Sequence, residues 1–175
     1  MTVVVGSGAV GLFFAKCMLA AGHTDVVVVE SGGEALGSFD AGSFQVIGRK
    51  HEGIRIGRSR SLGGTSNLWG GQLVEFSELD FRRRDWVDRS GWPISLADLK
   101  PHYLRAFEML GIGPSLVEDE PIWSSVLGSV PRIGDDLEVF LTRWMNVPSM
   151  ARQLRREIDE SPALHVLLGH AANGF

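Results

Sequence analysis

The feature that most constrains this chain is the hexapeptide Gly6-Ser7-Gly8-Ala9-Val10-Gly11, which has the pattern G-x-G-x-x-G. Residues 2–5 before it form a short continuous apolar run, which is typical of a buried strand. After it, apolar residues at helical spacing predict a helix that Gly22 ends. The residues of this expected core stripe are Val10, Phe13, Phe14, Cys17, Met18 and Ala21. The hexapeptide therefore lies between a strand and a helix, the context that a dinucleotide-binding turn requires.

Each glycine of the hexapeptide has a separate role in such a turn. Gly6 permits the tight turn, Gly8 lets the backbone approach a pyrophosphate, and Gly11 allows close packing of helix on strand. The helix N-terminus adds free N–H groups and the positive end of the helix dipole. We therefore predict that Gly6, Ser7, Gly8, Val10 and Gly11 bind the cofactor.

A second buried strand is predicted at residues 26–29, and it ends at Glu30. Glu30 follows the glycines at about the 20-residue spacing at which a carboxylate accepts the ribose hydroxyls of a dinucleotide. A 2'-phosphate at this place would meet like-charge repulsion, so FAD or NAD is favoured over NADP. The alternative is a glycine turn followed by an exposed glutamate without a ligand.

A second glycine-rich segment spans residues 58–71, with the sequence RSRSLGGTSNLWGG. Its paired glycines flank small hydroxyl and amide side chains, so several N–H groups can converge on one bound ligand. On composition alone, this segment is equally consistent with a structural loop in which Trp69 fills the core.

The remainder of the chain predicts further elements. Ser95 and Asp98 resemble a capping box, and Pro101 is expected to open the helix that ends before Gly111. A later helix is expected from Ser149, with one apolar face, and a strand at residues 164–168. Alternation at Phe44, Val46, Ile54 and Ile56 suggests short strands.

The composition excludes several classes of protein. The net charge of -4 gives no attraction to nucleic acid, and Cys17, the single cysteine, permits neither an internal disulfide nor a thiolate zinc site. Neither a signal peptide nor a transmembrane segment is visible, and no metal-ligand spacing occurs. We therefore expect a cytoplasmic protein that binds a small molecule.

Four blocks in order resemble the glucose-methanol-choline (GMC) oxidoreductases, and most closely their sugar-oxidising, pyranose-oxidase-like branch. These blocks are Glu30-Ser31-Gly32-Gly33, residues 62–71, Asp80-Phe81, and Gly91-Trp92-Pro93-Ile94 with Asp98-Leu99. The resemblance covers residues 2 to about 111. It implies an α/β fold with a doubly wound, mainly parallel, Rossmann-like sheet that binds FAD.

The resemblance also implies an activity and further site residues. The activity is oxidation of a CH–OH group of a sugar, polyol or other alcohol by hydride transfer to flavin, with an unspecified electron acceptor. The loop residues would lie along the cofactor, and Leu68 stands where some relatives carry a histidine that attaches flavin, so noncovalent FAD is expected. Beyond the turn and Glu30, the implied cofactor-binding residues are Ser31, Arg60, Gly63, Gly64, Thr65, Asn67, Trp69, Gly70 and Gly71.

The resemblance further implies one FAD-binding domain over residues 1–175, with dinucleotide and flavin loops at 1–71 and a helical and strand extension at 72–175. The histidine base of the family lies in a C-terminal substrate region that has no counterpart here, so no catalytic residue is assigned. Two alternatives remain open at this point. One is an NAD-dependent Rossmann dehydrogenase, because residues 6–22 also resemble the opening of ketopantoate-reductase-like enzymes, and the other is a truncated, non-catalytic nucleotide-binding relative.

Overall fold

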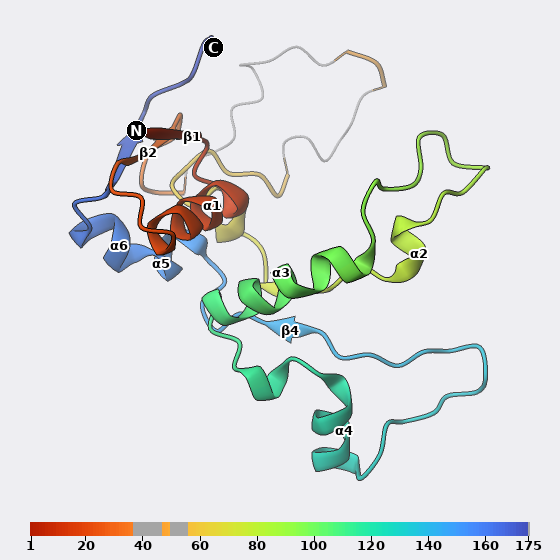
Figure 1. The fold of residues 1–175 in the computed structure, drawn as a ribbon. Coiled ribbons are helices and arrows are strands. Elements are labelled where there is room, and N and C mark those ends of the chain that lie inside the picture. Colours follow the sequence, from red (N-terminus) through yellow and green to blue (C-terminus); the bar gives the residue numbers. More distant parts are fainter. Residues whose placement is uncertain (37–46, 50–55, 175) are drawn as a thin grey trace. The chain divides into compact units, whose positions relative to one another are not determined.

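The computed structural model describes residues 1–36, 47–49 and 56–174 of the chain (Figure 1). The chain forms two compact units, Met1–Gly71 with Val147–Phe175, and Gln72–Asn146. The alternation predicted at Phe44, Val46 and Ile54 lies outside the described residues. Its last member, Ile56, is 76% exposed and lies in a bend, so the strand predicted there was wrong.

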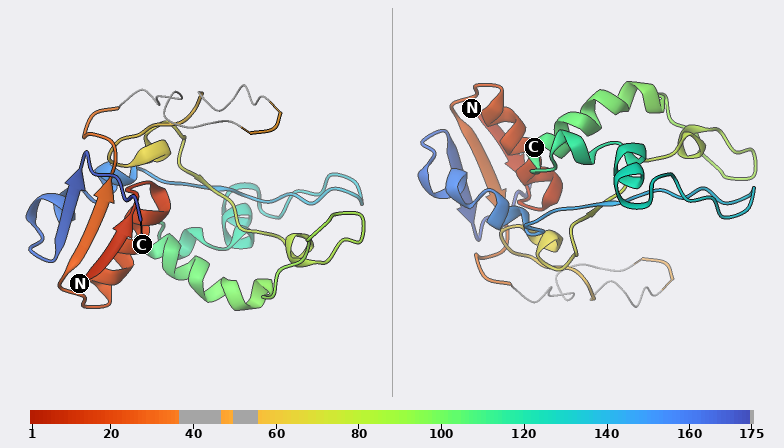
Figure 2. Two further views of the ribbon diagram at one scale, coloured as in Figure 1. Left: turned by 90° about the horizontal axis from the view of Figure 1, so that it is seen from above. Right: turned by 90° about the horizontal axis from the view of Figure 1, so that it is seen from below.

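The first unit is built on a parallel sheet of three strands in the order β1-β2-β5, seen from two sides in Figure 2. The strands are β1 (Thr2–Val5), β2 (Val26–Glu30) and β5 (Leu164–Leu168). Val28 of β2 is in register with Val4 of β1 and with Val166 of β5. The predicted α/β class with a parallel sheet is thus confirmed, and so are the three predicted strands.

Helix α1 (Ala9–Ala20) packs on one face of this sheet. A Cβ on Gly11 would lie 3.5 Å from Val4 Cγ1, and Leu12 and Ala15 are completely buried. The predicted core stripe of α1 was wrong for two of its residues, because Val10 is 84% exposed and Phe14 is 48% exposed. Lys16 is the only charged residue of α1, so apolar spacing in this helix could not identify the buried face.

The two faces of the sheet differ in exposure. Val4, Val26, Val28 and Leu164 are buried. On the opposite face, Val3, Val5 and Leu167 remain 50%, 51% and 43% exposed. Because parallel sheets are ordinarily covered on both faces, the described residues do not complete the doubly wound arrangement.

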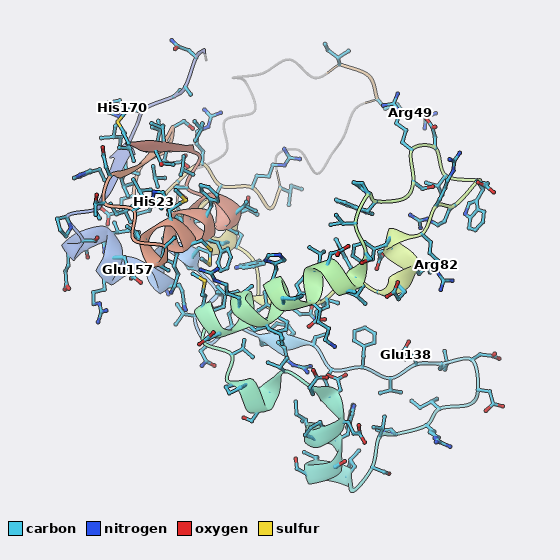
Figure 3. The ribbon with its side chains drawn as sticks, viewed as in Figure 1. His23, Arg49, Arg82, Glu138, Glu157 and His170 are labelled. Atoms are coloured by element: carbon cyan, nitrogen blue, oxygen red, sulfur yellow. The ribbon has the colours of Figure 1, made fainter. Side chains whose placement is uncertain are left out.

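A pair of short helices, α5 (Met150–Gln153) and α6 (Arg155–Glu160), replaces the single predicted helix. The predicted cap is confirmed, because Ser149 Oγ accepts the N–H of Arg152 at 3.4 Å. The helix is interrupted at Leu154, where φ is -103° and ψ is 16°, and this side chain is completely buried. Lys16 Nζ of α1 lies 3.9 Å from the Glu157 carboxylate of α6, and Glu157 is labelled in Figure 3.

The second unit contains a two-stranded antiparallel sheet and several helices. Its elements are β3 (Gln72–Leu73), α2 (Glu78–Phe81), α3 (Leu96–Met109), the 3-10 turn η4 (Pro114–Leu116), α4 (Asp119–Leu127) and β4 (Arg143–Trp144). Arg143 is 8% exposed, and its guanidinium donates to Asp119 Oδ1 at 2.6 Å and to the Leu141 carbonyl at 2.8 Å. This arginine therefore fastens β4 to α4 within the unit.

The capping box predicted for α3 is present in both directions. Ser95 Oγ accepts the Asp98 N–H at 3.3 Å, and Asp98 Oδ2 accepts the Ser95 N–H at 2.8 Å. The prediction that Pro101 opens the helix was wrong, since the capping box starts it at Leu96 and Pro101 lies inside it. Proline lacks an N–H, so this position leaves one intrahelical hydrogen bond unmade.

Candidate functional site

The glycine turn between β1 and α1 has the geometry that the sequence predicts. Gly6 has a φ of 93°, in the left-handed region that favours glycine, and its N–H donates to the Val29 carbonyl at 2.8 Å. Gly8 is the N-cap of α1, and no side chain caps this helix end. The first turn of α1 therefore offers backbone N–H groups and a positive dipole end to a ligand.

The other two glycines of the turn have opposite surroundings. A Cβ on Gly11 would lie 2.0 Å from the Gly6 carbonyl oxygen, which no packing arrangement tolerates. A Cβ on Gly8 would meet nothing within 4 Å. Gly11 is thus required by packing of the helix on the turn, whereas the missing side chain of Gly8 leaves open space in front of the helix N-terminus.

The glycine-rich loop packs directly on this turn. The Gly63 N–H donates to the Ser7 carbonyl at 3.0 Å, and a Cβ on Gly64 would lie 2.9 Å from Gly8 Cα. The Leu62 N–H donates to the Gly33 carbonyl at 2.9 Å. Two glycine-rich segments far apart in the sequence are therefore held together by backbone contacts that side chains would prevent.

The side chain of Asn67 holds the loop in its conformation. Its Nδ2 donates to the Leu62 carbonyl at 2.8 Å, and its Oδ1 accepts the Ser149 hydroxyl at 2.5 Å. Asn67 ends the 3-10 turn η3 (Gly64–Asn67). The amide of this predicted cofactor-binding residue is thus engaged within the protein, where it fastens the loop to the start of α5.

Two further contacts attach the loop to the segment before α5. Ser66 Oγ donates to the Gly63 carbonyl at 2.6 Å and accepts the Met150 N–H at 3.0 Å. Trp69 Nε1 donates to the Pro148 carbonyl at 2.7 Å. Trp69 is 38% exposed, so its ring is not the core filler of the purely structural interpretation.

An open cavity of about 410 Å³ lies between the turn and the loop. Its walls are the glycine turn, the first turn of α1, and Thr65, Ser66 and Trp69 of the loop. The volume falls within the range of about 300–1,000 Å³ that is usual for small-molecule clefts. Six of the predicted site residues line this cavity, namely Gly6, Gly8, Val10, Gly11, Thr65 and Trp69.

Glu30 is only 6% exposed, and its carboxylate is bonded to the turn. Its Oε2 accepts the Ser7 N–H at 3.0 Å and the Ser7 hydroxyl at 2.8 Å. Its Oε1 accepts the Gly32 N–H at 2.8 Å and the Ser31 hydroxyl at 3.4 Å. Burial acts to raise the pKa of Glu30, but these hydrogen bonds outweigh it and hold the pKa below its ordinary value.

The other predicted residues have structural surroundings outside the cavity wall. The Arg60 carbonyl packs on Gly32, where a Cβ would lie 2.1 Å from its oxygen. Gly71 is buried with a φ of 80°, and Gly70 is exposed. The predicted residues that do not line the cavity are therefore Ser7, Glu30, Ser31, Arg60, Gly63, Gly64, Asn67, Gly70 and Gly71.

Sequence reasoning missed the segment that follows β5. The His170 N–H donates to the Glu30 carbonyl at 2.9 Å, and the Gly169 N–H donates to the Gly32 carbonyl at 2.9 Å. His170, labelled in Figure 3, thus lies beside the carboxyl end of β2. The strand at 164–168 was predictable from alternation, but no pattern in the sequence around it could predict that it pairs with β2.

The histidines that the structure describes do not line the cavity. His23, His102, His165 and His170 are exposed, and none of them lines it. His51 lies outside the described residues. Within the described part of the chain, no group of three or more potential metal ligands occurs, and no helix is long and apolar enough to cross a membrane.

A second cavity, of about 430 Å³, lies within the second unit. Its wall includes Phe76, Phe107 and Phe140. Four of the charged side chains in the same wall form two pairs, with Lys100 Nζ 3.9 Å from Glu118 Oε1 and Arg143 bonded to Asp119. No residue predicted for the cofactor site lies in this cavity.

The chain was compared with protein-family models, with curated proteins and with solved structures, and none of them matches it. Any function assigned to the chain therefore rests on its own residues and their geometry.

Proposed function

We propose that this chain is the FAD-binding portion of a flavin-dependent oxidoreductase of the GMC type, which oxidises a CH–OH group of a sugar, polyol or other alcohol. The observation that carries the proposal is the position of Gly8. This glycine caps α1, lines the cavity, and leaves the space before the helix N-terminus free, while Gly64 of the loop packs against it.

The cavity suits a pyrophosphate at its inner end. Phosphate oxygens need backbone N–H donors and a positive potential, and the uncapped N-terminus of α1 offers both. A side chain on Gly8 would occupy this space, and a Cβ there would meet no described atom within 4 Å. A ligand that approaches the backbone closely accounts for a glycine at this position.

Glu30 suits the adenosine ribose. It ends β2 at the carboxyl edge of the sheet, where ligands of open α/β sheets bind. The low pKa keeps the carboxylate ionised at neutral pH, so it can accept hydrogen bonds from a diol and would repel a 2'-phosphate. This favours FAD or NAD over NADP.

The loop suits the flavin end of the cofactor. Thr65 and Trp69 line the cavity, and Leu68, 49% exposed, offers no nucleophile for covalent attachment. When bound, FAD supplies the acceptor for the hydride of the alcohol carbon. The residues of the chain bind and orient the cofactor through backbone N–H groups, the carboxylate of Glu30 and the wall of the loop.

Equilibrium titration of the purified 175-residue chain with FAD, ADP and NAD tests the proposal. We expect FAD to bind at least tenfold more tightly than NAD, because only FAD reaches the loop with its flavin, and ADP to bind through the turn alone. NAD binding with equal or higher affinity would replace the proposal with the NAD-dependent dehydrogenase. Absence of binding by all three nucleotides would refute both.

A further inference from the structure

Ser7 lies between Gly6 and Gly8 of the turn, and each of its polar atoms forms a hydrogen bond within the protein. Its N–H and its hydroxyl both donate to Glu30 Oε2, at 3.0 and 2.8 Å, and its carbonyl accepts the Gly63 N–H at 3.0 Å. The hydroxyl oxygen also lies 3.3 Å from the Ser61 carbonyl oxygen. Ser7 is completely buried, so none of these bonds competes with solvent.

These contacts create a conflict for the proposed ribose site. A carboxylate offers about four acceptor positions, and the chain itself supplies four donors to Glu30. Two of the donors are backbone N–H groups, from Ser7 and Gly32, which are fixed by the fold. The other two are hydroxyls, which rotate. A ribose diol can therefore bind only by replacing the hydroxyls of Ser7 and Ser31.

The surroundings of the Ser7 hydroxyl permit such a replacement. The hydroxyl has one hydrogen and two acceptors within reach, Glu30 Oε2 at 2.8 Å and the Ser61 carbonyl at 3.3 Å. Rotation of the hydroxyl hydrogen alone would leave the oxygen beside Glu30 Oε2, so the Ser7 side chain must also turn about its Cα–Cβ bond to vacate this acceptor position. The Ser61 carbonyl then keeps the hydroxyl paired and avoids the cost of an unsatisfied buried hydroxyl. Ser61 is itself completely buried and belongs to the loop that packs on the turn.

We propose that Ser7 is a positioning residue of the cofactor site: its hydroxyl occupies the ribose-binding face of the Glu30 carboxylate in the free protein and passes to the Ser61 carbonyl when a nucleotide ribose binds. The hydroxyl thereby keeps a buried carboxylate charged and oriented while the site is empty of ribose. This inference rests on the proposed function, because it requires that a nucleotide binds at the turn.

Loss of the hydroxyl has a specific consequence for the pH dependence of binding. Without it the buried carboxylate keeps its backbone donors but binds a proton more readily, because hydrogen bonds to the charged form are what lower the pKa of Glu30. A protonated carboxyl is a poorer acceptor for two ribose hydroxyls. The titratable residues on the neighbouring segments are Glu34, Arg58, Arg60, His165 and His170. All of them are present in both the wild type and Ser7→Ala, so a difference between the two proteins comes from the hydroxyl.

The test measures FAD affinity of the wild type, Ser7→Ala and Ser31→Ala between about pH 4 and pH 8. At pH 8, we expect Ser7→Ala to bind FAD with an affinity within about threefold of wild type. On acidification, both proteins should lose affinity, and the midpoint pH of this loss should be higher in Ser7→Ala by roughly one pH unit. Ser31→Ala removes the longer bond, at 3.4 Å, and should move the midpoint less. Protonation of the cofactor itself affects all three proteins equally.

A second measurement does not depend on the cofactor. Carbon-13 NMR of the labelled Glu30 carboxyl in the ligand-free chain, assigned with Glu30→Gln, should show a higher titration midpoint in Ser7→Ala than in wild type. Equal loss of affinity at every pH, or an unchanged Glu30 midpoint, would overturn the role of Ser7 and leave the proposed function intact. Failure of the wild type to bind FAD would overturn the proposed function and this inference with it.

Discussion

Glu30 Oε2 accepts both the backbone N–H and the hydroxyl of Ser7, at 3.0 and 2.8 Å, so the end of β2 is fastened to the turn before α1. Glu30 is 6% exposed, and the described chain supplies four hydrogen-bond donors to its carboxylate. A buried charge in such surroundings is stable only while those donors are in place. Glu30 therefore links the stability of the first unit to the proposed cofactor site.

The first prediction concerns stability at acidic pH. The pKa of Glu30 is lower in the folded protein than in the unfolded chain, so its contribution is complete above the unfolded value, near pH 4.5, and is lost as the pH falls through the folded value. Glu30→Gln should cost about 2 kcal/mol at pH 7. Thermal melting should show that the difference between the two proteins shrinks on acidification. A difference that stays constant with pH would contradict the role of the charge.

A second prediction concerns Gly11, whose substitution should affect folding itself. The Cβ of Gly11→Ala would lie 2.0 Å from the Gly6 carbonyl oxygen, and this contact is with backbone, which cannot rotate away. We expect the free energy of unfolding to fall by about 3 kcal/mol or more. Denaturant unfolding measures this, and a loss below about 0.5 kcal/mol would show that α1 does not pack on the turn as described.

The third prediction concerns the attachment of the cofactor. Because Leu68 is an apolar residue on the loop, any bound flavin should be noncovalent. Acid precipitation of the FAD-loaded chain should leave the yellow colour in the supernatant. Colour that remains in the pellet would require another residue of the chain to bond the flavin.

The fourth prediction concerns turnover. No histidine lines the cavity among the described residues, and a positioned general base contributes about 10²- to 10⁴-fold where it operates. The 175-residue chain loaded with FAD should therefore fail to reduce a dye with sugars or alcohols. Turnover that persists after further purification would contradict this and would direct attention to His51, His102, His165 and His170.

The sequence predicted the local part of this site well and the long-range part poorly. The strand, turn and helix at residues 2–20 follow from apolar runs and glycines whose spacing has one physical interpretation. The buried face of α1 did not follow, because nearly every residue of that helix is apolar. Pro101 was misplaced because the capping box of Ser95 and Asp98 determines the helix start more strongly than the proline does.

Contacts between segments that are far apart in the chain could not be predicted from the sequence. Asn67 was predicted to face a ligand, yet its amide is bonded to Leu62 and to Ser149. The pairing of β5 with β2, which brings His170 beside Glu30, depends on tertiary structure alone. Residue types predicted the turn and the loop that line the cavity, but they could not indicate which side chains hold these segments together.

The central claim, that the open space before Gly8 receives the pyrophosphate of a bound cofactor, is tested most directly by FAD titration of Gly8→Ala beside Gly113→Ala. Both glycines have extended backbones with φ of -67° and -65°, and a Cβ on either meets no atom within 4 Å, so neither substitution should lower the melting temperature. Only Gly8 lines the cavity. We predict that Gly8→Ala weakens FAD binding at least tenfold, about 1.4 kcal/mol, while Gly113→Ala binds as the wild type does. Equal FAD affinity of all three proteins would contradict the claim.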